Sequence, residues 1–394
     1  MISEKMKNLV KNSSVIRAMF EEGKKMAKEY GANNVYDFSL GNPSVEPPKE
    51  VNEAIVSVVS KEGSMAVHGY MNNSGYEDVR EAIASSLNTR FATNFSKENL
   101  LMTVGAAGGL NVILKTLLNP GDEVIVFAPF FGEYRNYVAN FDGDLVVVSP
   151  NKESFQPNLS EFADKITVKT KAVIVNTPNN PTGVVYSKET IVAISDILTK
   201  AQEHFNTSIY LISDEPYREL VYDGVEVPYL TKYYKNTVVG YSYSKSLSLP
   251  GERIGYLVMP NELDDFEEIV QAANVANRIL GFVNAPSLMQ RVVKETLALT
   301  TDCSIYNKNR ELLYHKLTEY GYEMVKPEGA FYLFIKSLEE DDKAFVEKAK
   351  AHHLLLVPGS SFGCSGYVRL AYCVDYAMIE RALPAFLKLA EEYK

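Results

Sequence analysis

The sequence predicts an α/β protein in which a mainly parallel seven-stranded sheet is sandwiched by helices, with a smaller α+β domain attached. Seven short apolar runs rich in β-branched residues alternate with longer helical segments, which is typical of parallel strands joined by helical crossovers. The alternation stops near Gly281, where a different order of elements begins. With 394 residues, the chain is long enough for one large and one smaller domain.

The predicted strands of the large domain cover residues 100–104, 123–127, 145–148, 172–175, 209–212, 237–241 and 254–259. The helices predicted between them cover residues 107–118 and 188–204, and a further helix starts near Phe131. The strand segments are continuous apolar runs, and such runs indicate strands that are covered on both faces.

The smaller domain is expected to be formed by both termini. After Gly281 come a long helical stretch, strands at 330–335, 354–357 and 367–373, and a closing helix from Tyr376. We therefore assign residues 46–280 to a large cofactor-binding domain, and residues 1–45 together with 281–394 to the small domain.

Charge and composition exclude several kinds of partner. The net charge is −10 without any long block of one sign, so neither nucleic acid nor an anionic membrane is an expected partner. The segment 1–30 lacks the apolar core of a signal peptide, and no apolar run could span a bilayer. The three cysteines and five histidines have no metal-ligand spacing. We expect a small-molecule substrate, no metal and a reducing, cytoplasmic location.

Polar residues follow the carboxyl ends of four predicted strands. They are the loops 105–109 and 176–183, Asp214 and Lys245. Because ligands bind outside these strand ends in open α/β sheets, four segments far apart in sequence are expected to share one site. Each has a simpler explanation when taken alone: a turn for 176–183, a helix cap for Asp214 and a solvated surface position for Lys245.

Taken together, the motifs resemble a known family. In chain order they are Asn180-Pro181-Thr182-Gly183, Asp214-Glu215-Pro216-Tyr217, Ser242-Tyr243-Ser244-Lys245 and Arg253. This set resembles the class I/II aminotransferases of the aspartate aminotransferase superfamily, which are pyridoxal 5'-phosphate enzymes of fold type I. Similar segments at 40–43, 68–70 followed by Gly75, 327–332 and 368–370 extend the resemblance over nearly the whole chain.

The resemblance implies three catalytic residues. Lys245 would form a Schiff base with pyridoxal 5'-phosphate and, once released by substrate, act as the general base. Asp214 would face the pyridine nitrogen, and Asn180 and Tyr217 would hydrogen-bond the phenolic oxygen. The cationic cofactor and Arg253 are expected to lower the pKa of Lys245 from its ordinary value of about 10.4.

The remaining cofactor contacts implied by the resemblance come from Gly105, Ala106, Ala107, Phe131, Ser242, Arg253 and, in the partner subunit, from Tyr70. The amides of a helix N-terminus and a guanidinium suit a phosphate dianion. Phe131 would stack on the cofactor ring, whereas Phe130 is expected in the core. Many relatives carry Ser or Thr where Ala106 and Ala107 stand, so main-chain groups would bind more of the phosphate here.

The substrate α-carboxylate would pair with Arg369, beside Gly41 and Asn180. The alternative for Arg369 is a surface salt bridge. The residue that reads the substrate side chain stays open: Arg278 and Arg135 could face a distal carboxylate, and 25 tyrosines make an aromatic pocket equally possible. Aspartate or a broad range of amino acids is favoured as the amino donor.

A homodimer with shared active sites is also implied, because Tyr70 is useful only where it reaches a neighbour's phosphate. The N-terminal helix, with Val15, Ile16 and Met19 as its apolar cluster, is expected either to clasp the partner as an arm or to pack on its own small domain.

The predicted reaction is transfer of an amino group between an L-amino acid and a 2-oxo acid. A carbon–sulfur β-lyase on the same scaffold is the main alternative, and the intact Arg369 favours transamination over it. A non-catalytic amino-acid-binding relative is the third possibility. Such sensors usually carry a DNA-binding segment, which neither the residues before Gly41 nor the charge suggests. Mixing the protein with aspartate and 2-oxoglutarate distinguishes a transaminase from a non-catalytic binder, since a binder would not turn these substrates over.

Overall fold

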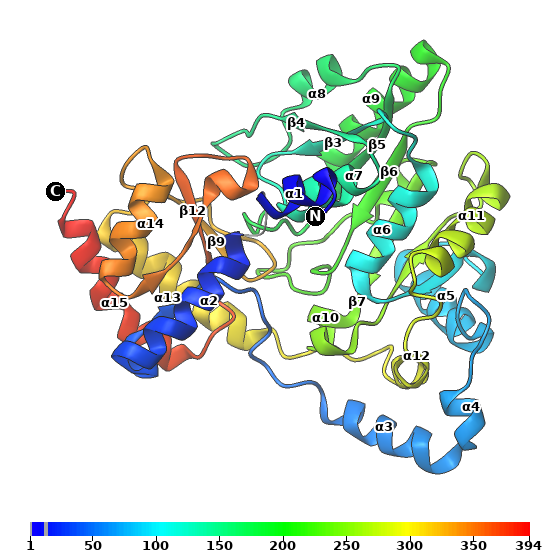
Figure 1. Cartoon of the computed structure of the whole chain (residues 1–394), viewed down its shortest axis with the longest axis horizontal. Coiled ribbons are helices and arrows are strands. Elements are labelled where there is room, and N and C mark those ends of the chain that lie inside the picture. The colour runs from blue at the N-terminus through cyan, green and yellow to red at the C-terminus, as the bar shows by residue number, and fades with distance from the viewer. Residues whose placement is uncertain (1, 12–14) are drawn as a thin grey trace.

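The computed structural model describes residues 2–11 and 15–394. At its centre is a seven-stranded sheet (Figure 1) made of β2 (Leu100–Thr103), β3 (Glu123–Phe127), β4 (Asp144–Val148), β5 (Thr170–Asn176), β6 (Tyr210–Asp214), β7 (Thr237–Ser242) and β8 (Gly255–Val258). The strand order is β2-β8-β7-β6-β5-β3-β4, and β8 runs antiparallel to both of its neighbours. The predicted mainly parallel seven-stranded sheet is confirmed.

Helices cover both faces of this sheet, as predicted. One layer consists of α6 (Gly105–Leu117), α7 (Glu133–Asn140) and α11 (Phe266–Ile279), and the other consists of α8 (Leu159–Lys165) and α9 (Lys188–Phe205). Strand β3 supplies both layers, because Val124 and Val126 join the first core while Ile125 and Phe127 join the second. This double burial explains why the strands read as continuous apolar runs.

A third group of helices packs around the β2–β8 edge. It contains α3 (Lys49–Lys61), α4 (Ser64–His68), α5 (Glu77–Phe91) and α12 (Ser287–Glu295), which share one core with β2, β7 and β8. Met289 and Val293 of α12 are buried in that core. The domain boundary at residue 281 stays a prediction.

The small α+β part combines segments from both ends of the chain. Its elements are α2 (Val15–Tyr30), β1 (Tyr36–Asp37), α13 (Ser304–Tyr320), β9 (Tyr332–Lys336), α14 (Asp342–Ala351), β10 (Leu354–Leu355), β11 (Val357–Pro358), β12 (Tyr367–Ala371) and α15 (Tyr376–Glu391). Strands β11, β12 and β9 form an antiparallel sheet, and β1 pairs in parallel with β10. Because β1 and β10 lie far apart in sequence, their pairing joins the N-terminal segment to the C-terminal one.

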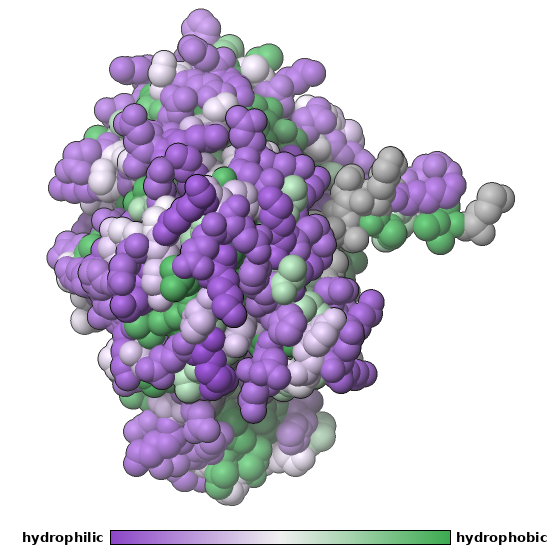
Figure 2. Space-filling view, turned by 90° about the vertical axis from the view of Figure 1, so that its left-hand side faces the viewer, coloured by the Kyte–Doolittle hydropathy of each residue, from purple (hydrophilic) through white to green (hydrophobic). Residues whose placement is uncertain are grey.

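The two N-terminal helices differ in how they pack. On α2, Met19 is buried in the small-domain core, so this helix packs on its own chain; the side chains of Val15 and Ile16 lie outside the described residues. Helix α1 (Glu4–Lys11) forms the narrow protrusion at the right of Figure 2. The exposed apolar side chains of Met6 and Val10 on this helix, and of Ile2 just before it, follow one another at intervals of four residues.

None of the helices in the described parts of the chain is both long and apolar enough to cross a lipid bilayer.

Candidate active site

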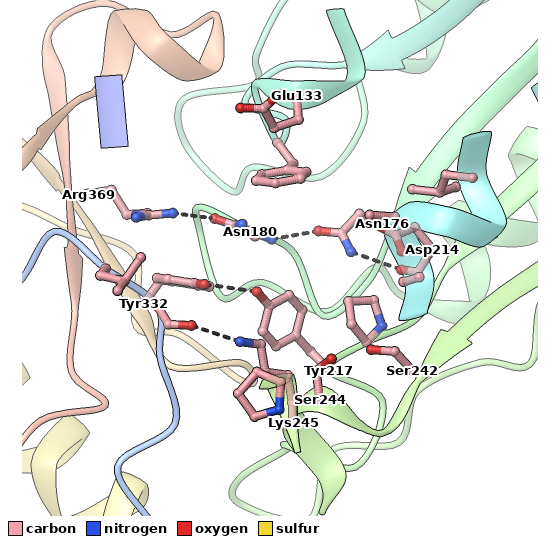
Figure 3. A pocket seen from close by; sticks show the side chains of 18 of the residues that line it. Glu133, Asn176, Asn180, Asp214, Tyr217, Ser242, Ser244, Lys245, Tyr332 and Arg369 are labelled. Carbon is pink, nitrogen blue, oxygen red and sulfur yellow. Dashed lines mark hydrogen bonds between the residues drawn. The ribbon is translucent and has the colours of Figure 1, made fainter. Parts of the chain in front are cut away.

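The four predicted loops meet at one cavity of about 570 Å³ between the sheet and the small domain. Among its lining residues are most of those expected at the site: Gly41, Ala106, Ala107, Phe131, Asn180, Asp214, Tyr217, Ser242, Lys245, Arg253 and Arg369. Figure 3 shows the side chains of Asn180, Asp214, Tyr217, Ser242 and Lys245 around the same space in the large domain, with Arg369 of β12 facing them. The carboxyl ends of β5, β6 and β7 form its floor, as expected for an open α/β sheet.

Lys245 lies on the short helix α10 (Tyr243–Ser246), which starts directly after β7. Its Nζ donates a hydrogen bond to the main-chain oxygen of Gly41 at 2.8 Å. Burial lowers the pKa of Lys245 to about 8, with Arg253 and Arg369 adding to the decrease. The effect of Arg253 agrees with the prediction that it helps to lower this pKa, and burial lowers the pKa by more than this charge does. A neutral, nucleophilic amine is therefore accessible close to neutral pH.

Asp214 ends β6 and is held by two neighbours. Its Oδ2 accepts a hydrogen bond from Tyr134 Oη at 2.5 Å, and its main-chain oxygen accepts one from Asn176 Nδ2 at 2.9 Å. Its Oδ1 is buried and has no partner among the described residues. Burial raises the pKa of this carboxyl to about 7. A cationic N–H donor in the cavity would satisfy Oδ1 and favour the ionised carboxylate.

Arg369 lies on β12 and is 1% exposed. Its Nη1 donates to Asn180 Oδ1 at 3.0 Å, and its Nη2 donates to the main-chain oxygen of Ser39. In residues 2–11 and 15–394 no carboxylate forms an ion pair with it, so a surface salt bridge does not account for this arginine. Burial lowers its pKa, which an anionic ligand would reverse.

An anion cradle lies at the start of α6. Arg253 crosses the helix N-terminus, where its Nη2 donates to the main-chain oxygen of Val104 at 3.3 Å. Gly105 has a φ of +77°, and a Cβ there would lie 2.7 Å from Arg253 Nη2. Only glycine therefore permits this approach. Together with the amides of Ala106 and Ala107, the guanidinium offers a phosphate the donors that it needs.

Two further expectations concern aromatic residues. Phe131 lines the cavity, while Phe130 is 2% exposed in the core beneath α7. Tyr70 is 95% exposed and does not line the cavity of its own chain. That Tyr70 serves a neighbouring subunit stays a prediction.

The predicted cations for a distal carboxylate do not line the cavity. Arg135 lies over the ring of Phe130 at 4.7 Å, and Arg278 is exposed on α11. The cation that does line the cavity beside the expected ones is Lys24 of α2, near Phe20 and Glu21. Sequence reasoning missed it because a helical Lys is ordinarily solvated.

Sequence reasoning also missed three polar residues of the cavity region. Tyr134 and Asn176 hold Asp214. Tyr332 lines the cavity and its Oη lies 2.8 Å from Tyr217 Oη. Asn176 begins the predicted loop 176–183 and Tyr332 closes the 327–332 motif, so both carried a positional signal. Nothing in the sequence pairs Tyr134 with Asp214.

A seven-stranded α/β sheet with a buried lysine, a buried carboxylate and an anion cradle at its carboxyl edge defines a pyridoxal 5'-phosphate enzyme of fold type I. The family model described as aminotransferase class I and II matches residues 33–386. The chain therefore belongs to the class I and II aminotransferases. It is a pyridoxal-phosphate-dependent transaminase that moves an amino group between an L-amino acid and a 2-oxo acid.

Individual relatives agree over nearly the full length. Aromatic-amino-acid aminotransferase 2 of Thermococcus litoralis is 30% identical over 97% of each chain. Aspartate aminotransferase of Thermotoga maritima is 31% identical over 89% of this chain and 90% of its own. The crystal structure of an aminotransferase from Eubacterium rectale is 47% identical and superposes with a TM-score of 0.98, covering 100% of this chain and 99% of that one.

Proposed function

We propose that this aminotransferase accepts a broad range of L-amino acids, aspartate among them. The observation that carries this proposal is the composition of the wall opposite the cofactor side. Phe20 and Leu40 line the cavity there, and Lys24 is the cation that accompanies them. Apolar and aromatic surface accepts many side chains with small differences in binding energy. An exposed lysine adds only a modest preference for a distal carboxylate.

The names of the relatives point in the same direction. Similar proteins are named aspartate, aspartate/prephenate and aromatic-amino-acid aminotransferases, at comparable identities of 29% to 31%. No one of these substrate classes is favoured by identity. The wall of the cavity therefore decides between a broad and a narrow range.

We assign the chemical tasks to residues as follows. Pyridoxal 5'-phosphate, when bound, supplies an electron sink that stabilises negative charge at the substrate Cα. Lys245 would bind the cofactor and afterwards carry the proton to and from Cα, for which its lowered pKa suits it. Asp214 would keep the pyridine nitrogen protonated through its free Oδ1. Asn180 and Tyr217 would hold the phenolic oxygen.

Arg369 would orient the substrate. A carboxylate paired with two nitrogens of the guanidinium fixes rotation about Cα, so that the bond to hydrogen stands perpendicular to the cofactor ring. Asn180 already contacts Arg369, and Gly41 presents its backbone on the same side. This arrangement supports proton transfer at Cα over loss of the carboxylate.

A half-reaction screen tests the substrate range. The holoenzyme is mixed with each L-amino acid in turn, and the cofactor absorbance is followed without an acceptor. We expect aspartate, aromatic and aliphatic amino acids to react with kcat/KM values within about a hundredfold of one another. A single amino acid that exceeds all others by more than that contradicts a broad range. Ammonia and pyruvate from cysteine conjugates would reveal β-lyase activity.

We also propose that the active sites are shared in a homodimer. Val56, Val59, Met65 and Tyr70 expose apolar surface along α3 and α4, and α1 exposes a further apolar stripe. Exposed large apolar side chains on helices that pack against each other, as α3 and α4 do, are typical of a protein interface. Because Tyr70 is absent from the cavity of its own chain, a neighbour is the site that it can serve.

Mixed dimers test the shared site. We expect Lys245→Ala and Tyr70→Ala subunits to be weakly active on their own and their mixture to regain activity, since one site of a mixed dimer is then intact. No recovery, with subunit exchange verified by mass, would mean that Tyr70 acts within its own subunit or not at all.

The free state of Cys303, Cys364 and Cys373 supports a cytoplasmic location.

A further inference from the structure

Tyr332 has a hydroxyl that packing alone does not require. The residue begins β9, is 2% exposed and lines the cavity. Its Oη lies 2.8 Å from Tyr217 Oη, and this is the only hydrogen bond that the hydroxyl makes with the described residues. The two rings meet edge to face at 5.7 Å. A phenylalanine would fill the same volume, so the hydroxyl needs an explanation from the site.

The surroundings hold the hydroxyl in one place. The Arg369 guanidinium lies over the Tyr332 ring at 4.6 Å, which fixes the plane of the ring from the other side. A Cβ on residue 41 would lie 2.1 Å from Tyr332 Oη, so that the absence of a side chain at Gly41 is required for this approach. Tyr332 therefore lies between the proposed carboxylate site and Tyr217.

The number of protons fixes the direction of the hydrogen bonds. Each phenol has one proton to donate. If Tyr217 donates its proton into the cavity, toward the phenolic oxygen of the cofactor, then Tyr332 must be the donor in the pair. A hydroxyl that accepts one hydrogen bond becomes a stronger donor in the next, because the bonds polarise one another.

We propose that Tyr332 is a positioning residue, whose proton directs the Tyr217 proton toward the phenolic oxygen of the bound cofactor. This inference rests on the proposed role of Tyr217. It assigns to Tyr332 no contact with the reacting atoms.

The proposal predicts a spectroscopic change. A hydrogen bond donated to the phenolic oxygen disperses the negative charge of that oxygen. The oxygen then stabilises less strongly the proton on the Lys245 nitrogen that is bonded to the cofactor. In the Tyr332→Phe holoenzyme, we expect the pH midpoint of the visible absorbance to rise by roughly 0.3 to 1 pH unit. Tyr217→Phe should raise it further, and Tyr217→Phe/Tyr332→Phe should match Tyr217→Phe alone.

A matched control separates this role from the loss of any buried hydroxyl. Tyr222 is 4% exposed, and its Oη donates to the main-chain oxygen of Ala330 outside the cavity. We expect Tyr222→Phe to leave the midpoint unchanged. A shift as large as that of Tyr332→Phe would overturn the proposal.

A second variant gives the opposite sign. Replacing Tyr332 by 3-fluorotyrosine makes its hydroxyl more acidic and a stronger donor, so the midpoint should fall. An unchanged midpoint in both Tyr332 variants, with a shift in Tyr217→Phe, overturns the role of Tyr332 and leaves that of Tyr217 intact. An unchanged midpoint in Tyr217→Phe overturns the role of Tyr217 itself, and the role of Tyr332 with it.

Discussion

The two sides of the cavity are built differently. On the large-domain side, Tyr134, Asn176 and Asp214 are buried and joined by hydrogen bonds. On the opposite side, Glu21 and Lys24 of α2 are exposed, and Lys24 lies over the ring of Phe20 at 4.3 Å. Buried and bonded groups are fixed in position, whereas exposed side chains on a helix can rearrange. The difference indicates that the chemistry is rigidly set while the choice of substrate is adaptable.

The largest effect should come from the rigid side. Lys245→Ala removes the proton carrier, and we expect the half-reaction rate to fall by about three orders of magnitude or more, with the cofactor still bound noncovalently. Stopped-flow absorbance with aspartate measures it. Lys24→Ala is the matched control, because it removes a lysine from the adaptable side of the same cavity. Equal losses in both variants would abolish the contrast.

Asp214 should make the stability of the cofactor-free protein depend on pH. Its folded pKa of about 7 lies above the ordinary value of 3.8 for an aspartate, so the folded state binds the extra proton between these values. The stability of the cofactor-free protein therefore falls as pH rises through this window, by on the order of a few kcal/mol. Urea unfolding at both ends of the window measures it. Asp214→Asn should flatten this dependence, and a slope equal to that of the parent protein would contradict the assignment.

Arg369 should come next in size. Arg369→Ala leaves the carboxylate without its pair, and we expect kcat/KM to fall by about a hundredfold for every amino acid tested. Arg135→Ala removes an arginine that lies over Phe130 outside the cavity and should change little. A loss restricted to aspartate would instead mean that Arg369 reads the side chain.

The smallest effect should come from Lys24. Because it is exposed, Lys24→Ala should lower kcat/KM for aspartate by about tenfold or less and leave phenylalanine unaffected. The ratio of the two values, measured in one buffer, reports the preference. A far larger loss for aspartate would show that the adaptable side contains a dedicated carboxylate site.

The strands and the loops that follow them could be predicted from the sequence. A strand that is buried on both faces has a continuous run of apolar residues, and unusual polar residues follow the strand ends. Sequence reasoning did not reach Tyr134, since nothing in a sequence reports a hydrogen bond between residues 80 positions apart. It also named Arg278 and Arg135 as candidates for a distal cation beside an equally possible aromatic pocket, and neither arginine lines the cavity. The sequence around an exposed lysine on a helix is the same whether or not a cavity lies next to that lysine, so Lys24 could not be predicted.

The pairing of β1 with β10 has a consequence for synthesis on the ribosome. The large sheet uses residues 100–258, all of which precede β10 in the chain. Domains generally fold as their segments emerge, so this sheet can form while the N-terminal segment still lacks its partner strand. Arg369 follows β10, so the nascent chain can hold a cofactor-binding half before it can hold a substrate. Turnover therefore has to wait until translation has passed Arg369 and the small domain has formed around it.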